Sequence, residues 1–325
     1  MTSAGPKKST IVRTDDRRRA ARRRRAAAEL ALLRARLAVL QVLSPRRAAD
    51  AALELWCTTP DGAGRRRDDR RLPGALTTVM TAAGARVVVE TWTPETEPVG
   101  VVYLVHGWGG WRGQLGAFVE PLSAAGYRVV AFDAPSHGDS GPGVLGPRRS
   151  TMPEMAEALA AVVDAHGEPA AVVAHSLGTA TTALAVRDGL PAGRLVLVAA
   201  IADVLGELDG FADLLRLSRP TRDLLGARIA DRAGRPLSDL DVHETLRTHP
   251  VPPALVVHDR TDKEVAYPVG AALAAAWPEG ELLTTEGLGH HRLLRDPEVV
   301  RAVVDYVGPA RPSRAREQDV VRRRA

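Results

Sequence analysis

Cysteine is almost absent from this sequence, since the 325 residues include only Cys57. One thiol excludes an intrachain disulfide and any metal site built from cysteine pairs. The histidines and carboxylates show no spacing typical of metal ligands, so we expect neither a metal nor another cofactor. A chain without disulfides suits a reducing compartment, and we expect a cytoplasmic protein.

Long hydrophobic runs are also missing. The longest candidate, residues 26–43, is interrupted by Glu29, Arg34 and Arg36. These charges disfavour both a membrane-spanning helix and the apolar core of a signal peptide. Aromatic residues make up only 4% of the chain, so Ala, Val and Leu must form the core.

The charge is unevenly distributed along the chain. The net charge is +5, yet residues 1–50 have 14 Arg and Lys against 4 Asp and Glu, and residues 309–325 have 6 against 2. This leaves −9 for residues 51–308. The basic pI therefore belongs to the two ends, and the body between them is mildly acidic.

Residues 1–57 form a basic N-terminal extension, in which we expect residues 1–16 to be disordered. An arginine-rich run at residues 17–25 leads into a helical pattern that Ser44-Pro45 ends, and a second helix follows. Leucines recur along one face of the first helix at positions 30, 33, 37 and 40. We interpret the arginines as a solvated face on a helix whose leucines dock on the body. Weak contact with an anionic membrane surface is the alternative, and the lack of interleaved aromatics argues against nucleic acid.

From residue 76 to residue 308 the pattern is that of an α/β domain. A predicted antiparallel hairpin, 76–81 with 85–93, comes first. Predicted strands follow at 99–105, 127–132, 170–174, 194–200, 254–258 and 281–285, with helices at 114–125, 152–166, 177–187, 269–277 and 297–307. Continuous Val, Leu and Ala strands between amphipathic helices predict a mostly parallel central sheet with helices on both faces.

Two segments fall outside this alternation. Residues 203–250 are rich in Leu, Arg and Asp and too long for a loop, so we expect a small helical cap inserted above the strand ends. Residues 309–325 are expected to be a disordered basic tail.

Ser176 occupies a distinctive place between a predicted strand and a predicted helix. The sequence around it is Ala174-His175-Ser176-Leu177-Gly178, with small residues two before and two after the serine. A very tight turn needs small residues at those positions, and such a turn lifts a serine out of the backbone as a nucleophile.

Polar residues follow the other predicted strands at the edge where ligands bind in such sheets. They are His106-Gly107-Trp108-Gly109-Gly110, the segment from Asp133 to Ser140, the pair Asp259 and Asp262, and Gly287-Leu288-Gly289-His290-His291. These segments, with the serine turn, resemble the α/β-hydrolase superfamily in kind and order across residues 76–308.

The resemblance implies a role for each residue. Ser176 is the expected nucleophile, His290 the base that takes its proton, and Asp262 the acid that orients the imidazole. The backbone N–H groups of Trp108 and Leu177 are the expected oxyanion hole. The remaining histidines are expected to be structural or at the surface, and the segment from Asp133 is expected to shape the crevice.

Two of these assignments have neighbours as alternatives. Asp259 lies nearer the strand end, but the family pattern places the acid three residues later, at Asp262. His291 adjoins His290, but the motif's histidine directly follows Gly289. Trp108 and Trp111 are compatible equally with a pocket lining and with core packing.

The nucleophile narrows the expected chemistry. Relatives that open epoxides or displace halide use Asp at the position of Ser176. We therefore expect a serine hydrolase that cleaves a carboxylic ester or a related small acyl substrate through an acyl-enzyme. The alternatives are an acyltransferase on the same scaffold and a non-catalytic binding module anchored by its basic arm.

Overall fold

The computed structural model describes residues 9–60 and 72–308, so the predicted tail at 309–325 lies outside the described residues. The chain divides into two compact units. One combines Met1–Trp56 with Gly206–Ala230, and the other combines Cys57–Leu205 with Asp231–Ala325. Across the described ranges, no helix is both long and apolar enough to cross a membrane.

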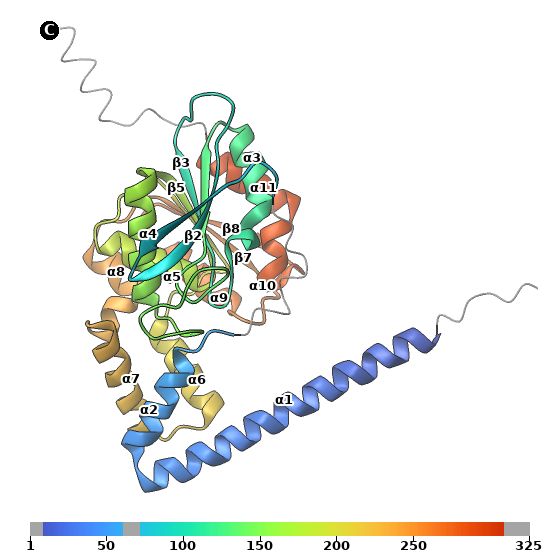
Figure 1. Cartoon of the computed structure of the whole chain (residues 1–325), viewed down its shortest axis with the longest axis vertical. Helices are drawn as coiled ribbons and strands as arrows, with labels where there is room; N and C mark the ends of the chain where they lie inside the picture. The colour runs from blue at the N-terminus through green and yellow to red at the C-terminus, as the bar shows by residue number, and fades with distance from the viewer. Residues whose placement is uncertain (1–8, 61–71, 309–325) are drawn as a thin grey trace, which may run out of the picture. The chain divides into compact units, whose positions relative to one another are not determined.

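The larger unit is built on an eight-stranded sheet (Figure 1). Its strands lie in the order β1-β2-β4-β3-β5-β6-β7-β8. The bounds are β1 Leu76–Ala82, β2 Ala85–Trp92, β3 Val101–Val105, β4 Arg128–Phe132, β5 Pro169–His175, β6 Leu195–Val198, β7 Ala254–Asp259 and β8 Gly280–Thr285. β1 and β2 form an antiparallel hairpin, β2 pairs antiparallel with β4, and the other pairs are parallel. The predicted mostly parallel sheet is confirmed.

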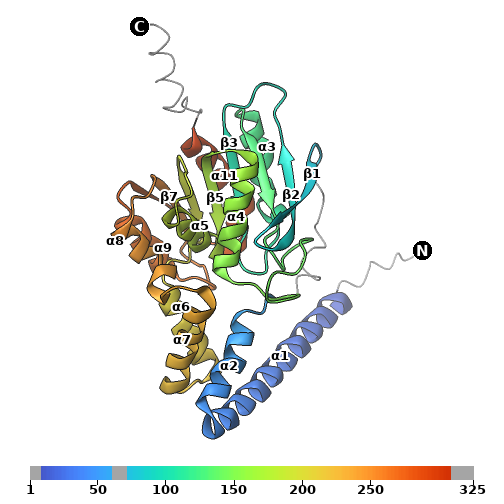
Figure 2. The same ribbon diagram turned by 60° about the vertical axis from the view of Figure 1, so that its left-hand side comes forward.

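The central strands are apolar because both of their faces are covered. Every residue of β3, β6 and β7 is buried, as expected for parallel strands beneath helices on each side. Figures 1 and 2 show α3 (Val119–Ala124) and α11 (Pro297–Val307) on one side of the sheet, with α4 (Met152–His166) and α5 (Leu177–Arg187) on the other.

The remaining helices of this unit are short, and several carry site residues. They are the 3₁₀ helices η2 Arg112–Phe118, η3 Leu237–Leu240 and η4 Leu293–Arg295, and the α-helices α8 Val242–Thr248, α9 Tyr267–Ala276 and α10 Gly289–Arg292. The single helix predicted over 114–125 is therefore two elements, η2 followed by α3. Leu115, which precedes Gly116, has non-helical backbone angles within η2.

The described part of the smaller unit consists of helices and short connections. It contains α1 (Ser9–Leu43) and α2 (Pro45–Trp56), together with most of α6 (Val204–Leu215) and α7 (Arg219–Ala233). α1 begins at Ser9, inside the stretch predicted to be disordered. Leu37, from the predicted leucine face, is buried. The first part of the predicted cap thus packs with the N-terminal helices.

Three kinds of contact hold α1 and α2 to α6 and α7. The rings of Trp56 and Phe211 meet edge to face at 5.2 Å. The Arg34 side chain donates to the Leu214 carbonyl at 2.8 Å, which caps the end of α6. Arg228 forms an ion pair with Asp50 at 2.9 Å.

Candidate active site

Ser176 lies in a strained turn between β5 and α5. Its φ of 55° and ψ of −125° are unusual for a residue with a Cβ. The turn closes tightly on the segment after β3: a Cβ on Gly178 would lie 2.7 Å from the His106 carbonyl, and one on Gly107 would lie 2.8 Å from the Ser176 Cβ. Both glycines are therefore required by close approach, as the small-residue pattern around the serine predicts.

Asp262 and His290 meet although 28 residues separate them. His290 Nδ1 lies 2.8 Å from Asp262 Oδ2, and the Asp262 side chain is fully buried. Burial opposes ionisation of this carboxyl, but hydrogen bonds from His290 and from the Glu264 and Val265 amides outweigh it and hold its pKa below the ordinary value. An ionised Asp262 keeps the Nδ1 proton on His290 and turns Nε2 into the acceptor.

Asp259, the alternative acid, is occupied elsewhere. Its two oxygens accept hydrogen bonds from Thr261, Thr285 and the Leu288 amide at 2.6–2.9 Å. These bonds tie the end of β7 to the end of β8 and to the loop that carries His290. Asp262, and not Asp259, is the carboxylate placed against that histidine.

His175 and His291 surround His290. The His175 Nε2 contacts the His290 carbonyl at 3.0 Å, and burial lowers the pKa of His175 to about 3, so the ring is a neutral donor there. His291, the alternative base, is 46% exposed and lies 3.1 Å from Glu264. Its ring lies at the surface beside that carboxylate, whereas the His290 ring is 5% exposed and bonded to Asp262.

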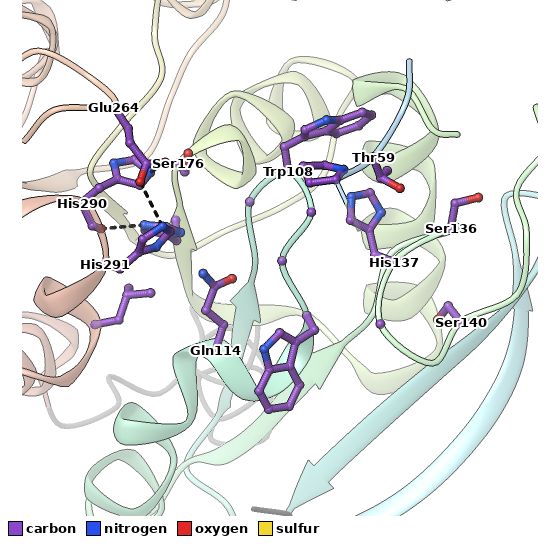
Figure 3. Close-up of a pocket in the computed structure, with 18 of the residues that line it drawn as sticks. Thr59, Trp108, Gln114, Ser136, His137, Ser140, Ser176, Glu264, His290 and His291 are labelled. Carbon is purple, nitrogen blue, oxygen red and sulfur yellow. Dashed lines mark hydrogen bonds and ion pairs between the residues drawn. The ribbon is translucent and has the colours of Figure 1, made fainter. Parts of the chain in front are cut away.

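Ser176 and His290 line one cavity of about 820 Å³. Figure 3 shows Ser176, Glu264 and His290 gathered on one side of it, with Trp108 and His137 on the other. Within the described residues the Ser176 hydroxyl makes no hydrogen bond, so it is available to a ligand in the cavity. Catalytic hydrogen bonds of this kind often tighten only when substrate binds.

The two predicted oxyanion donors are the Leu177 amide, directly after the serine, and the Trp108 amide, on the segment after β3 that approaches the serine turn. Leu177 is the first residue of α5, where a backbone N–H has no intrahelical acceptor. A Cβ on Gly107 would lie 3.4 Å from the Leu177 nitrogen, so the backbone just before Trp108 passes close to that amide. The Trp108 ring meets His137 edge to face at 5.3 Å and forms part of the cavity wall.

A buried ionic cluster lies behind this wall. The Arg112 guanidinium contacts Glu90 at 3.0 Å, Asp139 at 2.9 Å and Asp133, whose other oxygen accepts from the Arg112 amide at 2.6 Å. His106 adds a bond from the Ala134 amide at 3.0 Å. The cluster joins the segment after β3 to the segment after β4, so Asp133 shapes the crevice from behind.

Sequence reasoning missed several residues of the cavity. Glu264 was not singled out, nor were Gln114, the segment Thr59-Pro60 and the arginines at positions 148, 292 and 295. No motif marks them, and they converge from five separate segments of the chain. Among the described residues, no group of three or more His, Cys, Asp or Glu side chains could hold a metal ion.

The chain was compared with known proteins. Residues 102–303 match the model of the alpha/beta hydrolase family. A monoacylglycerol lipase of Mycolicibacterium smegmatis is 43% identical over 58 residues, which cover 18% of this chain and 21% of that lipase.

Solved structures share the fold at low identity. A thermophilic esterase from Thermogutta terrifontis is 19% identical, with a TM-score of 0.53, over 72% of this chain and 98% of that one. The esterase RhEst1 from Rhodococcus sp. ECU1013 is 23% identical, with a TM-score of 0.54, over 73% of this chain and 100% of that one. The family match spans more than half of the chain, and the sheet and its helices agree with it. The protein is a member of the alpha/beta hydrolase family.

Proposed function

We propose that this protein is a serine hydrolase that cleaves a carboxylic ester or a related acyl compound through an acyl-enzyme. The observation that carries the proposal is the 2.8 Å bond between Asp262 and a histidine that shares one cavity with Ser176. Family membership supports a hydrolase. The partial similarity to a monoacylglycerol lipase and the fold shared with two esterases support an ester as the bond cleaved.

In the proposed reaction, His290 Nε2 takes the proton from the Ser176 hydroxyl as its oxygen attacks the ester carbonyl carbon. The tetrahedral intermediate collapses when the C–O bond to the alcohol breaks and His290 returns the proton to that oxygen. Water then attacks the acyl-enzyme by the same route, which releases the acid and restores the serine. Asp262 stabilises the imidazolium that forms twice in this cycle.

Negative charge develops on the carbonyl oxygen at each attack. The Leu177 and Trp108 amides are the proposed donors to it, and one such donor is worth about 10²–10³ in kcat. Gly107, on which a Cβ would lie 3.4 Å from the Leu177 nitrogen, lets the segment that carries the second amide approach the serine turn.

We place this reaction in the cytoplasm. The only cysteine, Cys57, is 4% exposed, and a chain without disulfides suits a reducing compartment. Fractionation of cells that express the full chain tests this placement. Recovery in an extracytoplasmic fraction contradicts it.

The proposed function is tested by labelling and turnover together. A fluorophosphonate probe should label the wild-type protein and leave Ser176→Ala unlabelled. Hydrolysis of p-nitrophenyl esters of graded chain length should fall by several orders of magnitude in Ser176→Ala and in His290→Ala, with unfolding temperatures retained. Equal labelling of the wild type and Ser176→Ala overturns the proposal.

A further inference from the structure

The cavity beside Ser176 is positively charged although it lies in an acidic part of the chain. Its charged lining consists of Arg148, Arg292, Arg295 and Glu264. Residues 51–308 carry a net charge of −9, so an excess of cations at this one place runs against the average of the sequence. The histidines His137 and His175 do not add to the charge, because burial lowers the pKa of each to about 3.

The carboxylate in the lining does not neutralise these arginines. Glu264 lies 3.1 Å from His291, and its other oxygen lies 3.9 Å from His290. Within the part of the chain that the structure describes, none of the three arginines pairs with an acid. By contrast, four other arginines of the same unit do so at 2.6–3.0 Å: Arg112, Arg187, Arg235 and Arg247.

Arg292 is held in place without being neutralised. Its Nε donates to the Leu288 carbonyl at 2.7 Å, and one of its terminal nitrogens donates to the Gly287 carbonyl. These two acceptors precede His290 in the same loop, so neutral backbone groups of that loop hold the guanidinium. Arg295 follows in η4, and Arg148 reaches the cavity from the segment that precedes α4.

Guanidinium groups at a cavity wall attract an anion in two ways. A guanidinium donates charge-assisted hydrogen bonds to a carboxylate. Several charges of one sign in a cleft also raise the local concentration of an oppositely charged ligand, in a manner that salt screens.

We propose that the substrate is an ester that carries an anionic group, such as a carboxylate, in its acyl or its alcohol part, and that Arg148, Arg292 and Arg295 bind that group. The inference rests on the proposed function and narrows its substrate class. The ester carbonyl lies at Ser176, while the anion lies against the arginines. The specificity is then for charged esters over neutral esters of the same length.

Matched esters test this. Monoethyl adipate differs from ethyl hexanoate only in a carboxylate that replaces the terminal methyl group of the acyl chain. The ester of hexanoic acid with glycolate differs from ethyl hexanoate by the same replacement in the alcohol part. The wild type should show kcat/KM at least tenfold higher for an anionic ester than for its neutral partner. This ratio of kcat/KM values should decrease as the salt concentration rises.

Substitutions of the arginines test whether they cause the preference for the anionic ester. Arg148→Gln with Arg295→Gln removes two guanidinium groups that make no hydrogen bonds within the described residues, and should lower the ratio of kcat/KM for the anionic ester to kcat/KM for ethyl hexanoate about tenfold. Arg301→Gln is the matched control, since Arg301 is exposed on α11, pairs with no acid among the described residues and lies outside the cavity lining. It should leave the ratio at the wild-type value.

The outcomes separate this inference from the proposed function. If neutral esters are hydrolysed through Ser176 and neither anionic ester is preferred, the charged-substrate inference is wrong and the serine hydrolase remains. If no ester is turned over, binding of the same esters to the Ser176→Ala protein decides between the outcomes. Tryptophan fluorescence, to which Trp108 and Trp111 in the cavity lining contribute, measures this binding. Tighter binding of an anionic ester that the double variant abolishes supports the inference, and equal binding of both esters overturns it.

Discussion

Two buried carboxylates lie past strands of the same sheet, and they have different surroundings. Asp133, after β4, is enclosed with Arg112, Glu90 and Asp139, and the Arg112 side chain is 5% exposed. Asp262, after β7, is equally buried but bonds to His290, which lines the cavity. In the first cluster the Arg112 guanidinium bonds to all three carboxylates, whereas the second leaves a ring nitrogen of His290 for chemistry. Buried charge alone therefore does not mark a catalytic site, and remaining hydrogen-bonding capacity at a cavity does.

The largest expected effect comes from breaking the pair formed by Asp262 and His290. Asp262→Asn keeps the volume of the side chain but removes the charge and favours the wrong tautomer of His290, so kcat for an ester should fall by about 10⁴. Kinetics on a p-nitrophenyl ester measure this. The thermal unfolding midpoint serves as the control for folding, and a kcat within tenfold of the wild type would remove Asp262 from the mechanism.

Breaking the cluster around Arg112 should lower the stability of the fold more than it lowers catalysis. Arg112→Met leaves Glu90 and Asp133 buried without their cation, which should lower the free energy of unfolding by about 3–5 kcal/mol. Urea denaturation measures the loss. Arg301→Met, at an exposed position, should change stability by less than about 0.5 kcal/mol. Equal stability of the two variants would contradict the role given to the cluster.

Much of the sheet could be predicted from the sequence because its strands are continuous apolar runs. The predicted strand 254–258 is β7, Ala254–Asp259, and the predicted helix 297–307 is α11. Boundaries moved where a turn residue decides them. α9 begins at Tyr267, two residues before the predicted start, because Pro268 suits the first turn of a helix.

The cavity was less predictable than the elements around it. Ser176 and His290 follow strands and carry motifs, so sheet topology places them at one edge. Arg148 and Arg295 carry no motif, and only the course of their loops brings them to the same cavity. The association of residues 206–230 with the N-terminal helices depends likewise on long-range packing, since a leucine face predicts burial without naming its partner.

Acid should lower the stability of the folded protein through three buried histidines near the Arg112 cluster and the serine turn. Burial lowers the pKa of His106 to about 4 and those of His137 and His175 to about 3, against about 6.5 in an unfolded chain. Below about pH 6.5 the unfolded chain takes up protons that the folded protein does not, so stability falls as pH falls. At pH 5 the loss is on the order of 2 kcal/mol for each histidine.

Urea denaturation at pH 7.5 and pH 5.0 measures this loss, and His137→Gln should make the dependence shallower. The lowered pKa of Asp262 acts in a separate window below about pH 4, where its protonation removes the bond to His290. A stability that does not change between pH 7.5 and pH 5.0 contradicts the neutral, buried state of these rings.

The smallest effect sharpens the contrast between buried and exposed ion pairs. Arg228 and Asp50 meet at 2.9 Å in the helical unit, a distance like those in the Arg112 cluster, but their side chains are 40% and 57% exposed. Water solvates both charges when the pair is broken, so a double-mutant cycle with Arg228→Gln and Asp50→Asn should give a coupling below about 1 kcal/mol that decreases in high salt. A coupling as large as the loss of about 3–5 kcal/mol expected for Arg112→Met would mean that geometry, and not burial, sets the strength of these pairs.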